Sequence, residues 1–188
     1  MANQELIPRR AVIEEYVRYD ARKKKLVVPA DMADWDWSSA DDLDRRLRSA
    51  KFKPGIIAGY TDWKRVELAY RELANCAICN GIFPGVTRVL GQLTLSGLEN
   101  WKPDRDVEWF EPLERGPDYP TEWPMILRPA VKSESPAMWY VEDGSGRAIC
   151  FFRRLVRTAD YTSRAFGYLG IAPDANSTFM KDNFRGLL

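Results

Sequence analysis

The sequence predicts a mixed α/β fold in which a helical N-terminal region precedes a small mixed sheet with flanking helices. Apolar residues recur at helical spacing through the first eighty residues, whereas beyond Pro84 they fall in short runs separated by glycine, proline and charge. The 12 glycines and 12 prolines argue against a plain helical bundle. A chain of 188 residues has the length of one compact domain, so we expect a helical region over residues 1–85 packed on a core over residues 86–188.

Two helices are expected before residue 50. Over residues 9–22, apolar side chains recur at helical spacing behind Pro8, a residue suited to a first helical turn. A second helix is expected to begin near Ser39, because the Ser-x-x-Asp spacing to Asp42 resembles a capping box. Leu43 and Leu47 then lie one turn apart on its apolar face.

The clearest helical pattern runs over residues 61–81. Thr61 is placed to cap this helix and Gly81 to end it. Its apolar stripe consists of Trp63, Val66, Tyr70, Leu73 and Ala77. We therefore expect the first eighty residues to be mainly helical.

The second half of the chain is expected to mix short strands with helices. Strands are predicted at 92–98, 125–127 and 138–141, and helices at 106–115, 147–157 and 158–169. In the helix at 147–157, the periodicity assigns Arg147, Arg154 and Arg157 to the polar side.

The absence of histidine is the most informative feature of the composition. It excludes Ser-His-Asp and Cys-His nucleophile pairs and every His-ligated metal site. The chain begins without a basic segment followed by an apolar core, and it has no apolar run long enough to cross a bilayer, so a cytosolic location is expected. Three cysteines agree with a reducing compartment.

Two other patterns have a structural interpretation that outweighs the functional one. Cys76 and Cys79 form a C-x-x-C pair, but they fall in the last turn of the helix expected at 61–81, where the helix dipole opposes a thiolate. We therefore expect buried, inert thiols. The basic runs at 22–25 and 45–53 have acids nearby and are expected to be solvated helix faces rather than a nucleic-acid surface.

The stretch with the strongest chemical signal runs from Trp139 to Ala148. It places an apolar strand, a turn containing Gly144 and Gly146, and a helix start in immediate succession. The first amides of a helix lack intrahelical partners and lie at the positive end of its dipole, so such a turn suits a phosphate. A β-hairpin remains the alternative, since Asp-Gly is a common turn pair and residues 148–152 have some β-propensity.

This region resembles the core of the ParB/sulfiredoxin superfamily. The residues that carry the likeness are 124–129 (PMILRP), 139–141 (WYV) and 143–147 (DGSGR), followed by a helix. The likeness covers about residues 90–157 and implies nucleotide-phosphate binding at the turn. Ser145 and Gly146 stand where sulfiredoxins have Cys-His, so reductase chemistry is not expected. Too few residues follow Arg147 for the helix-turn-helix and dimerisation region of partition proteins.

In its size, its single core and its helical prefix, the chain is similar to the plasmid-encoded fertility-inhibition (oncogenic suppression) proteins of this superfamily. That likeness implies an ATPase and DNase that degrades or blocks DNA transferred through a type IV secretion system. The implied partners are ATP, DNA and a secretion coupling protein or DNA–protein transfer intermediate, which would hold the chain peripherally at the inner membrane. The alternative is a non-catalytic nucleotide- or DNA-binding module that inhibits a secretion or partition partner by occupying its surface.

The candidate site residues follow from these two readings. Phosphate or nucleotide would be bound by Gly144, Ser145, Gly146, Arg147 and Arg128. Catalysis would use Glu142, Asp143, Arg147 and Glu99, with Arg147 offsetting developing charge and a carboxylate orienting water. Asp143 and Asp106 are the candidate ligands of Mg²⁺ or a similar divalent cation, because a nuclease without histidine needs a metal to generate hydroxide near neutral pH.

Overall fold

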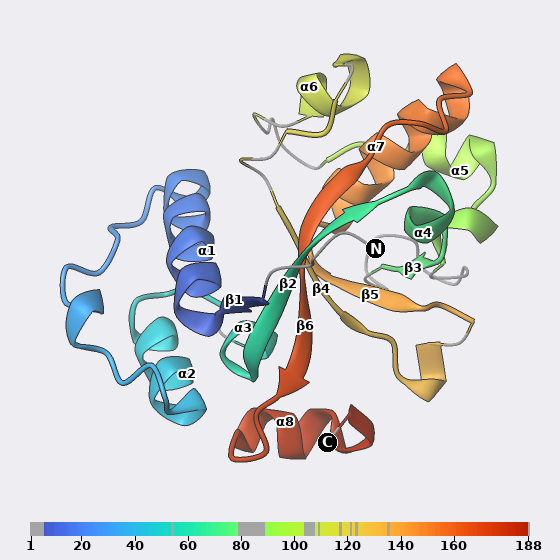
Figure 1. The fold of residues 1–188 in the computed structure, drawn as a ribbon. Helices are drawn as coiled ribbons and strands as arrows, with labels where there is room; N and C mark the ends of the chain where they lie inside the picture. The colour runs from blue at the N-terminus through green and yellow to red at the C-terminus, as the bar shows by residue number, and fades with distance from the viewer. Residues whose placement is uncertain are drawn as a thin grey trace. The chain divides into compact units, whose positions relative to one another are not determined.

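The computed structural model describes residues 6–53, 55–78, 89–103, 108, 110–116, 118–120, 122, 124–134 and 136–187. The fold is mixed α/β, as the sequence predicts (Figure 1). Its six-stranded mixed sheet has the order β1-β2-β6-β4-β5-β3. The strands are β1 Leu6–Pro8, β2 Tyr60–Leu68, β3 Cys76–Ala77, β4 Met125–Pro129, β5 Trp139–Asp143 and β6 Ala165–Pro173. The helices are α1 Arg9–Lys24, α2 Ala40–Ser49, α3 Gly55–Ala58, α4 Tyr70–Ala74, α5 Leu95–Asn100, α6 Phe110–Arg115, α7 Ser145–Thr158 and α8 Thr178–Asn183.

The sheet combines parallel and antiparallel pairings. β1 is antiparallel to β2 and β4 is antiparallel to β5, whereas β4 and β6, like β3 and β5, are parallel. The β4–β5 register shifts between Ile126 and Leu127, and Arg128 lies opposite Tyr140. This register determines which side chains of β4 and β5 meet, and it is used below. Among the described helices, none is long and apolar enough to cross a bilayer.

The chain divides into two compact units that interleave in sequence. The first comprises Met1–Arg65 and Gly170–Leu188, and the second comprises Val66–Leu169. The boundary expected between residues 85 and 86 lies in the segment 79–88, outside the described residues. That expected division stays a prediction.

The first unit confirms the two helices predicted before residue 50. α1 begins directly after Pro8 and buries Val12, Ile13 and Val17. α2 begins after Ser39, whose hydroxyl accepts a hydrogen bond from the Asp42 amide at 3.2 Å, as the capping pattern predicts. Both helices therefore follow from local signals in the sequence.

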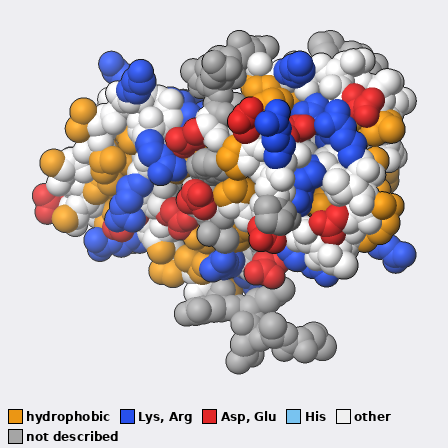
Figure 2. All heavy atoms as spheres, turned by 90° about the horizontal axis from the view of Figure 1, so that it is seen from above, with side chains coloured by type: hydrophobic (Ala, Val, Ile, Leu, Met, Phe, Trp, Pro, Cys, Tyr) orange, Lys and Arg blue, Asp and Glu red, His pale blue; other side chains and the backbone are white. Residues whose placement is uncertain are grey.

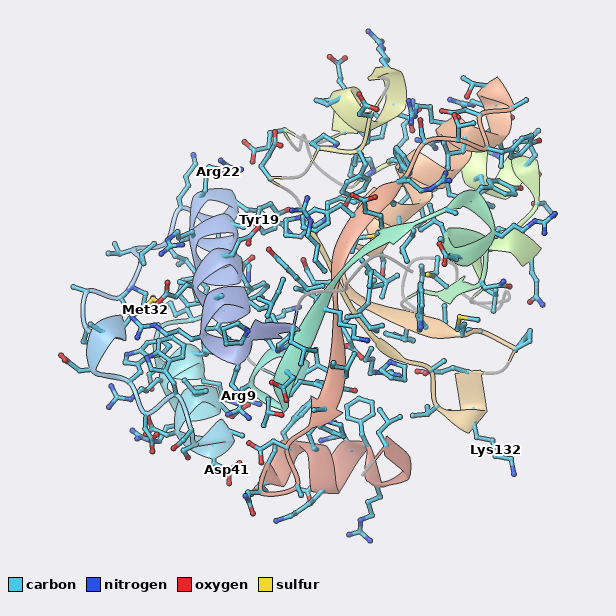
Figure 3. The ribbon with its side chains drawn as sticks, viewed as in Figure 1. Arg9, Tyr19, Arg22, Met32, Asp41 and Lys132 are labelled. Carbon is cyan, nitrogen blue, oxygen red and sulfur yellow. The ribbon has the colours of Figure 1, made fainter. Side chains whose placement is uncertain are left out.

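Long-range polar contacts complete the first unit. Arg9 donates from Nε to the Tyr60 carbonyl at 2.7 Å and from Nη2 to Asp174 at 2.5 Å, so the start of α1 is joined to β2 and to the end of β6. Asp41, at the start of α2, accepts hydrogen bonds from the amide and hydroxyl of Thr178, at the start of α8. Figure 3 shows Arg9 at the lower end of α1 and Asp41 beside α8. None of these partners is a neighbour in sequence.

The helix predicted over 61–81 is wrong. Residues 60–68 form β2, a short helix α4 follows, and β3 begins at Cys76. Trp63 and Val66 fit a helical stripe, but Val66, Glu67 and Leu68 alternate buried, exposed and buried, as a strand requires. Pairing of β2 with β1 and β6 satisfies its backbone and overrides the helical spacing.

Two further predicted elements are wrong in type. Residues 95–100 form α5 rather than a strand, because the Thr94 hydroxyl caps the helix by accepting from the Gly97 amide. A helix is also predicted at 158–169, but α7 ends at Thr158 and the chain forms β6 from Ala165, which pairs with β4. In contrast, the strands near 125–127 and 138–141 and the helix near 147–157 are confirmed as β4, β5 and α7. The helix predicted at 106–115 is confirmed over Phe110–Arg115, whereas residues 104–107 and 109 lie outside the described part.

In the second unit, α7 is the central helix. α4, α5 and α6 all pack against it (Figure 1). Its apolar side chains are buried, among them Ile149, Phe151 and Leu155. Neighbours thus surround α7 on several sides, and three of its arginines, Arg147, Arg153 and Arg154, are buried as well.

Candidate functional site

The turn between β5 and α7 has the strand–turn–helix form that the sequence predicts. β5 ends at Asp143 and α7 begins at Ser145, so the hairpin interpretation is wrong. Gly144 has φ 99°, a left-handed conformation that favours glycine. A Cβ at this position would also lie 2.7 Å from Nη2 of Arg147. The backbone conformation therefore favours glycine here, and the guanidinium of Arg147 lies folded over it.

The N-terminus of α7 lacks a side-chain cap. Its N-cap residue is Gly144, which has no side-chain oxygen to accept from the first-turn amides. The hydroxyl of Ser145 turns the other way and donates to the Val141 carbonyl at 3.3 Å. The positive end of a 14-residue helix is thus left without the side-chain acceptor that most such helices have.

Arg147 and Asp143 form an ion pair across this turn. Arg147 Nη2 lies 2.5 Å from Asp143 Oδ2. The Arg147 side chain is 1% exposed and that of Asp143 is 32% exposed. Of the three arginines assigned to the polar side of the helix, Arg147 and Arg154 are buried, whereas Arg157 is exposed. The carboxylate of Asp143 places negative charge near the helix N-terminus, as the dipole favours.

Arg128 on β4 joins two carboxylates, that of Glu134 in the 3-10 turn after β4 and that of Glu142 on β5. Its Nη1 and Nη2 each donate to Glu134 at 2.7 Å, and its Nε donates to Glu142 at 2.5 Å. The guanidinium also lies over the ring of Tyr140, 4.3 Å from its centroid. Burial raises the pKa of Glu142, although the positive charge of Arg128 opposes this shift. The structure thus places Arg128 and Glu142 together, while the bidentate contact of this guanidinium is made with Glu134.

Of the remaining candidate residues, the described one, Glu99, is not brought to the turn. Glu99 lies on α5 and pairs with Arg157 at 3.5 Å. Arg157 is ten residues along α7 from Arg147, which is about 15 Å of helix. Asp106 lies outside the described residues.

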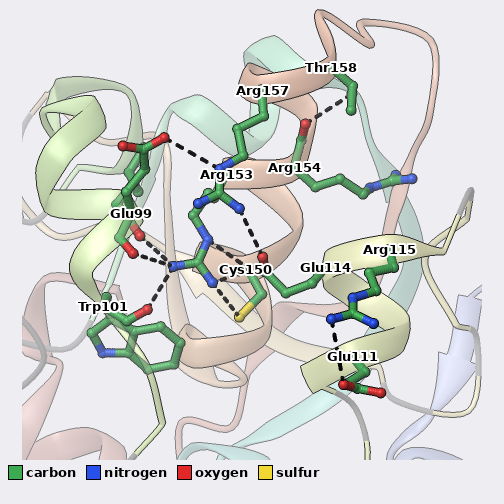
Figure 4. A network of polar contacts seen from close by, with 11 residues as sticks. Glu99, Trp101, Glu111, Glu114, Arg115, Cys150, Arg153, Arg154, Arg157 and Thr158 are labelled. Carbon is green, nitrogen blue, oxygen red and sulfur yellow. Dashed lines mark hydrogen bonds and ion pairs between the residues drawn. The ribbon is translucent and has the colours of Figure 1, made fainter.

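A second arginine cluster, absent from the sequence interpretation, lies farther along α7 (Figure 4). Arg153 Nη1 donates to the carbonyls of Leu98 at 2.5 Å and Trp101 at 2.6 Å, and Nε donates to Glu114 at 2.8 Å. The side chain of Arg153 is 2% exposed. It therefore holds the ends of α5 and α6 against α7. No local pattern in the sequence distinguishes Arg153 from the exposed arginines near it.

The two described cysteines have the buried, inert character that we expected. Cys76 and Cys150 are buried, and burial raises the pKa of each thiol to about 12. Cys76 lies in β3 rather than in a helix, and Cys79 lies outside the described residues. Within the described part of the chain, no three acidic, histidine or cysteine side chains are grouped as a metal site requires.

The basic runs of the first unit are paired with acids. Asp42 pairs with Arg45 and Arg46, and Asp44 pairs with Arg48 at 2.7 Å. Figure 2 shows basic and acidic side chains interspersed over the face in view. This mixing weakens the electrostatic field that a nucleic-acid backbone would require.

Comparisons with known proteins identify no relative. No family model matches the chain, and searches of curated proteins and of solved structures found no match either. The function is therefore argued from the geometry of the chain itself.

Proposed function

We propose that the chain binds the phosphates of ATP at the N-terminus of α7, in a fold of the ParB/sulfiredoxin type. The main support for this proposal is that α7 follows β5 through Gly144, with no side-chain cap on its first turn among the described residues. The order of β4, β5, glycine turn and helix supports the proposed fold type. A phosphate at this point would receive the positive end of the helix dipole.

Arg147 is expected to exchange its partner Asp143 for the bound phosphate. Its guanidinium already lies over Gly144, where it pairs with Asp143. A phosphate with two negative charges would compete with the single charge of Asp143 for this guanidinium. Because Asp143 is partly exposed, its carboxylate would be solvated once displaced. Binding would therefore exchange an internal ion pair for a ligand ion pair.

We extend the proposal to hydrolysis of ATP and DNA, the activity implied by the likeness to fertility-inhibition proteins of type IV secretion. Glu142 is the candidate for orienting water, since its raised pKa suits a general base. Arg147 would offset the charge that develops on the transferred phosphoryl group. Glu99 has no part in this scheme, because its partner Arg157 lies far along α7.

The described residues do not fit the divalent cation that the likeness implies. Glu142 and Asp143 are each held by an arginine at 2.5 Å, so a metal would have to displace both guanidinium groups. Oxygen ligands already committed to cations make a poor Mg²⁺ site. Asp143 is therefore assigned to the ion pair with Arg147, and this poor fit of the described residues to a cation weighs against the DNase part of the proposal.

The same observation favours a second candidate, a non-catalytic module that binds ATP or DNA and blocks a secretion or partition partner. Such a module needs the anion-binding turn but no free carboxylate. In the described site, Glu134, Glu142 and Asp143 are all engaged by Arg128 or Arg147.

A pair of variants at Gly146 tests the proposed site. Gly146 has a negative φ within α7, so a side chain is compatible with its backbone. Gly146→Glu adds a carboxylate in the first turn, where it suits the helix but repels phosphate, and Gly146→Gln is the matched neutral control. Calorimetric titration with ATP is expected to show affinity reduced about tenfold or more in Gly146→Glu relative to Gly146→Gln.

Turnover separates the two candidates. Release of phosphate from ATP and nicking of plasmid DNA by the wild type, lost in Gly146→Glu, would support the hydrolase. Binding of ATP without turnover would support the module. Equal ATP affinity in the Glu and Gln variants, or no binding by the wild type, would contradict the proposed site.

A further inference from the structure

A cavity in the second unit lies away from the glycine turn. It has a volume of about 560 Å³ and is lined by Ala69, Tyr70, Arg71 and Tyr161. The first three residues come from the start of α4, and Tyr161 follows the C-terminal end of α7. This volume is within the range of pockets that bind small molecules.

The two tyrosines that line this cavity pack against each other, and Tyr70 also packs on α7. Tyr70 stacks on Phe152 of α7 with ring centroids 5.3 Å apart and an interplanar angle of 19°. Tyr161 meets Tyr70 edge-on, with centroids 4.8 Å apart and an angle of 79°. Tyr161 nevertheless remains 58% exposed. A ring face is thus held in place while much of its area is open to a ligand.

The loop that carries Tyr161 is fixed by local hydrogen bonds. Oδ1 of Asp160 accepts from the amide and hydroxyl of Thr162, both at 2.9 Å, and from the Ser163 amide at 3.1 Å. Hydrogen bonding from the Ser163 side chain, together with the bonds from the Ser163 amide and from Thr162, holds the pKa of Asp160 well below its ordinary value. Because the loop is ordered without a ligand, binding on Tyr161 would cost little conformational entropy.

Arg71 supplies a positive charge at the same cavity. Its side chain is exposed, and no carboxylate of the described residues pairs with it. The adjacent carboxylate of Glu72 is engaged instead, accepting from the Ala69 amide at 2.7 Å. The guanidinium of Arg71 is therefore available to an anionic group of a ligand.

From this combination we propose that the cavity binds a nucleotide, with its base stacked on Tyr161 and its phosphate paired with Arg71. Every nucleobase offers a flat face to an aromatic ring, and a guanidinium suits a phosphate. A free mononucleotide and a nucleotide within a single DNA strand share this chemistry. The site goes beyond the proposed phosphate site at Gly144 and does not depend on it.

The test uses the full chain and three probes: AMP, a fluorescein-labelled oligothymidylate, and an abasic strand of the same length. Tyr161→Leu is expected to weaken binding of AMP or the oligothymidylate about tenfold, within the range measured for loss of base stacking. Tyr161→Phe keeps the ring face and is expected to bind like the wild type. The abasic strand is expected to bind equally to wild type and Tyr161→Leu, because it has no base to stack.

The charge contribution is tested separately. Arg71→Gln is expected to weaken binding of every probe and to reduce its dependence on salt. Arg115→Gln is the matched control, since Arg115 is exposed in the same unit and lies on α6. Its loss changes the net charge equally but is expected to leave affinity near that of the wild type.

The outcomes decide the proposal and the source of the nucleotide. Tyr161-dependent binding of AMP identifies a mononucleotide site, and Tyr161-dependent binding of the oligothymidylate alone identifies a strand site. Unchanged affinity in both Tyr161→Leu and Arg71→Gln, or no binding of either base-containing probe by the wild type, overturns the proposal. Gly146→Glu is expected to retain Tyr161-dependent binding, so failure of the proposed ATP site is distinguishable from failure of this one.

Discussion

The two ends of α7 hold buried arginines in different ways. At the N-terminal end, Arg147 pairs with Asp143 four residues earlier, across a single glycine turn. Toward the other end, Arg153 pairs with Glu114 and with the carbonyls of Leu98 and Trp101, all far away in sequence. The first arrangement is local and has an exposed carboxylate. The second joins three helices and lies inside the unit.

The difference teaches that burial of an arginine does not by itself mark a binding site. In the Arg153 cluster the guanidinium already donates to backbone carbonyls and a carboxylate, so it is not open to a ligand. The Arg147 pair has one partner that can turn to solvent. Only the local pair is therefore suited to exchange its partner for a phosphate.

The largest effect is expected for Arg153→Ala. Removing this guanidinium leaves the carbonyls of Leu98 and Trp101 without their Arg153 donor and leaves Glu114 with the partly exposed Arg157, which should lower the free energy of unfolding by about 3–5 kcal/mol. Arg157→Ala is the control, since Arg157 is 42% exposed and should cost about 1 kcal/mol or less. Urea denaturation of both variants measures the free energy of unfolding. Equal losses in the two variants would contradict the expectation that the interior pair contributes more than the surface pair.

A smaller effect is expected for Arg147→Gln. Asp143 loses its partner but is solvated, so the free energy of unfolding should fall by about 1–2 kcal/mol. Chemical denaturation again provides the measurement. A loss as large as that of Arg153→Ala would show that the turn is as rigidly built as the other cluster, and that Asp143 is not readily displaced.

Ser39→Ala extends the comparison to a local device in the first unit. Loss of the hydroxyl that accepts from the Asp42 amide should cost about 1 kcal/mol. Ser38→Ala is a suitable control, because Ser38 precedes α2 and its hydroxyl donates to Asp36, which also lies before the helix. Thermal unfolding of the two variants would reveal no difference if the cap contributed nothing.

The smallest effect is a change in pH dependence in Glu142→Gln. The pKa of Glu142 is raised above its ordinary value of 4.5, so the folded chain retains a proton that the unfolded chain has lost. Stability of the wild type therefore falls as pH rises from about 4.5 through the raised pKa, and the cost persists above it. The glutamine variant should lack this descending contribution. Urea midpoints at a series of pH values measure it, and identical slopes would contradict the prediction.

Local signals predicted part of the fold correctly. The Ser39 cap, the apolar spacing of α1 and the Gly144 turn are each encoded within a few residues, and α2, α1 and α7 are confirmed. β2 could not be predicted in this way, since its pairing with β1 and β6 involves residues distant in sequence. Its spacing of Trp63 and Val66 fits a helix equally well until those partners are known.

The candidate site shows the same division. The Asp143–Arg147 pair is four residues apart on a helix start, so it was accessible to sequence reasoning. The link between Arg128 and Glu142 depends on the antiparallel register, in which Arg128 lies opposite Tyr140. The cavity at Tyr70 and Tyr161 forms because the chain after α7 lies beside the start of α4, and no sequence motif predicts this contact.

The buried thiols have a practical consequence for following the molecule in solution. With pKa values near 12, Cys76 and Cys150 react with alkylating agents only when the second unit opens and exposes them. Mass-resolved labelling of these two positions thus gives two built-in reporters, one on β3 and one on α7, for the opening of that unit. A bound nucleotide that steadies the unit would slow both labelling rates without any engineered probe.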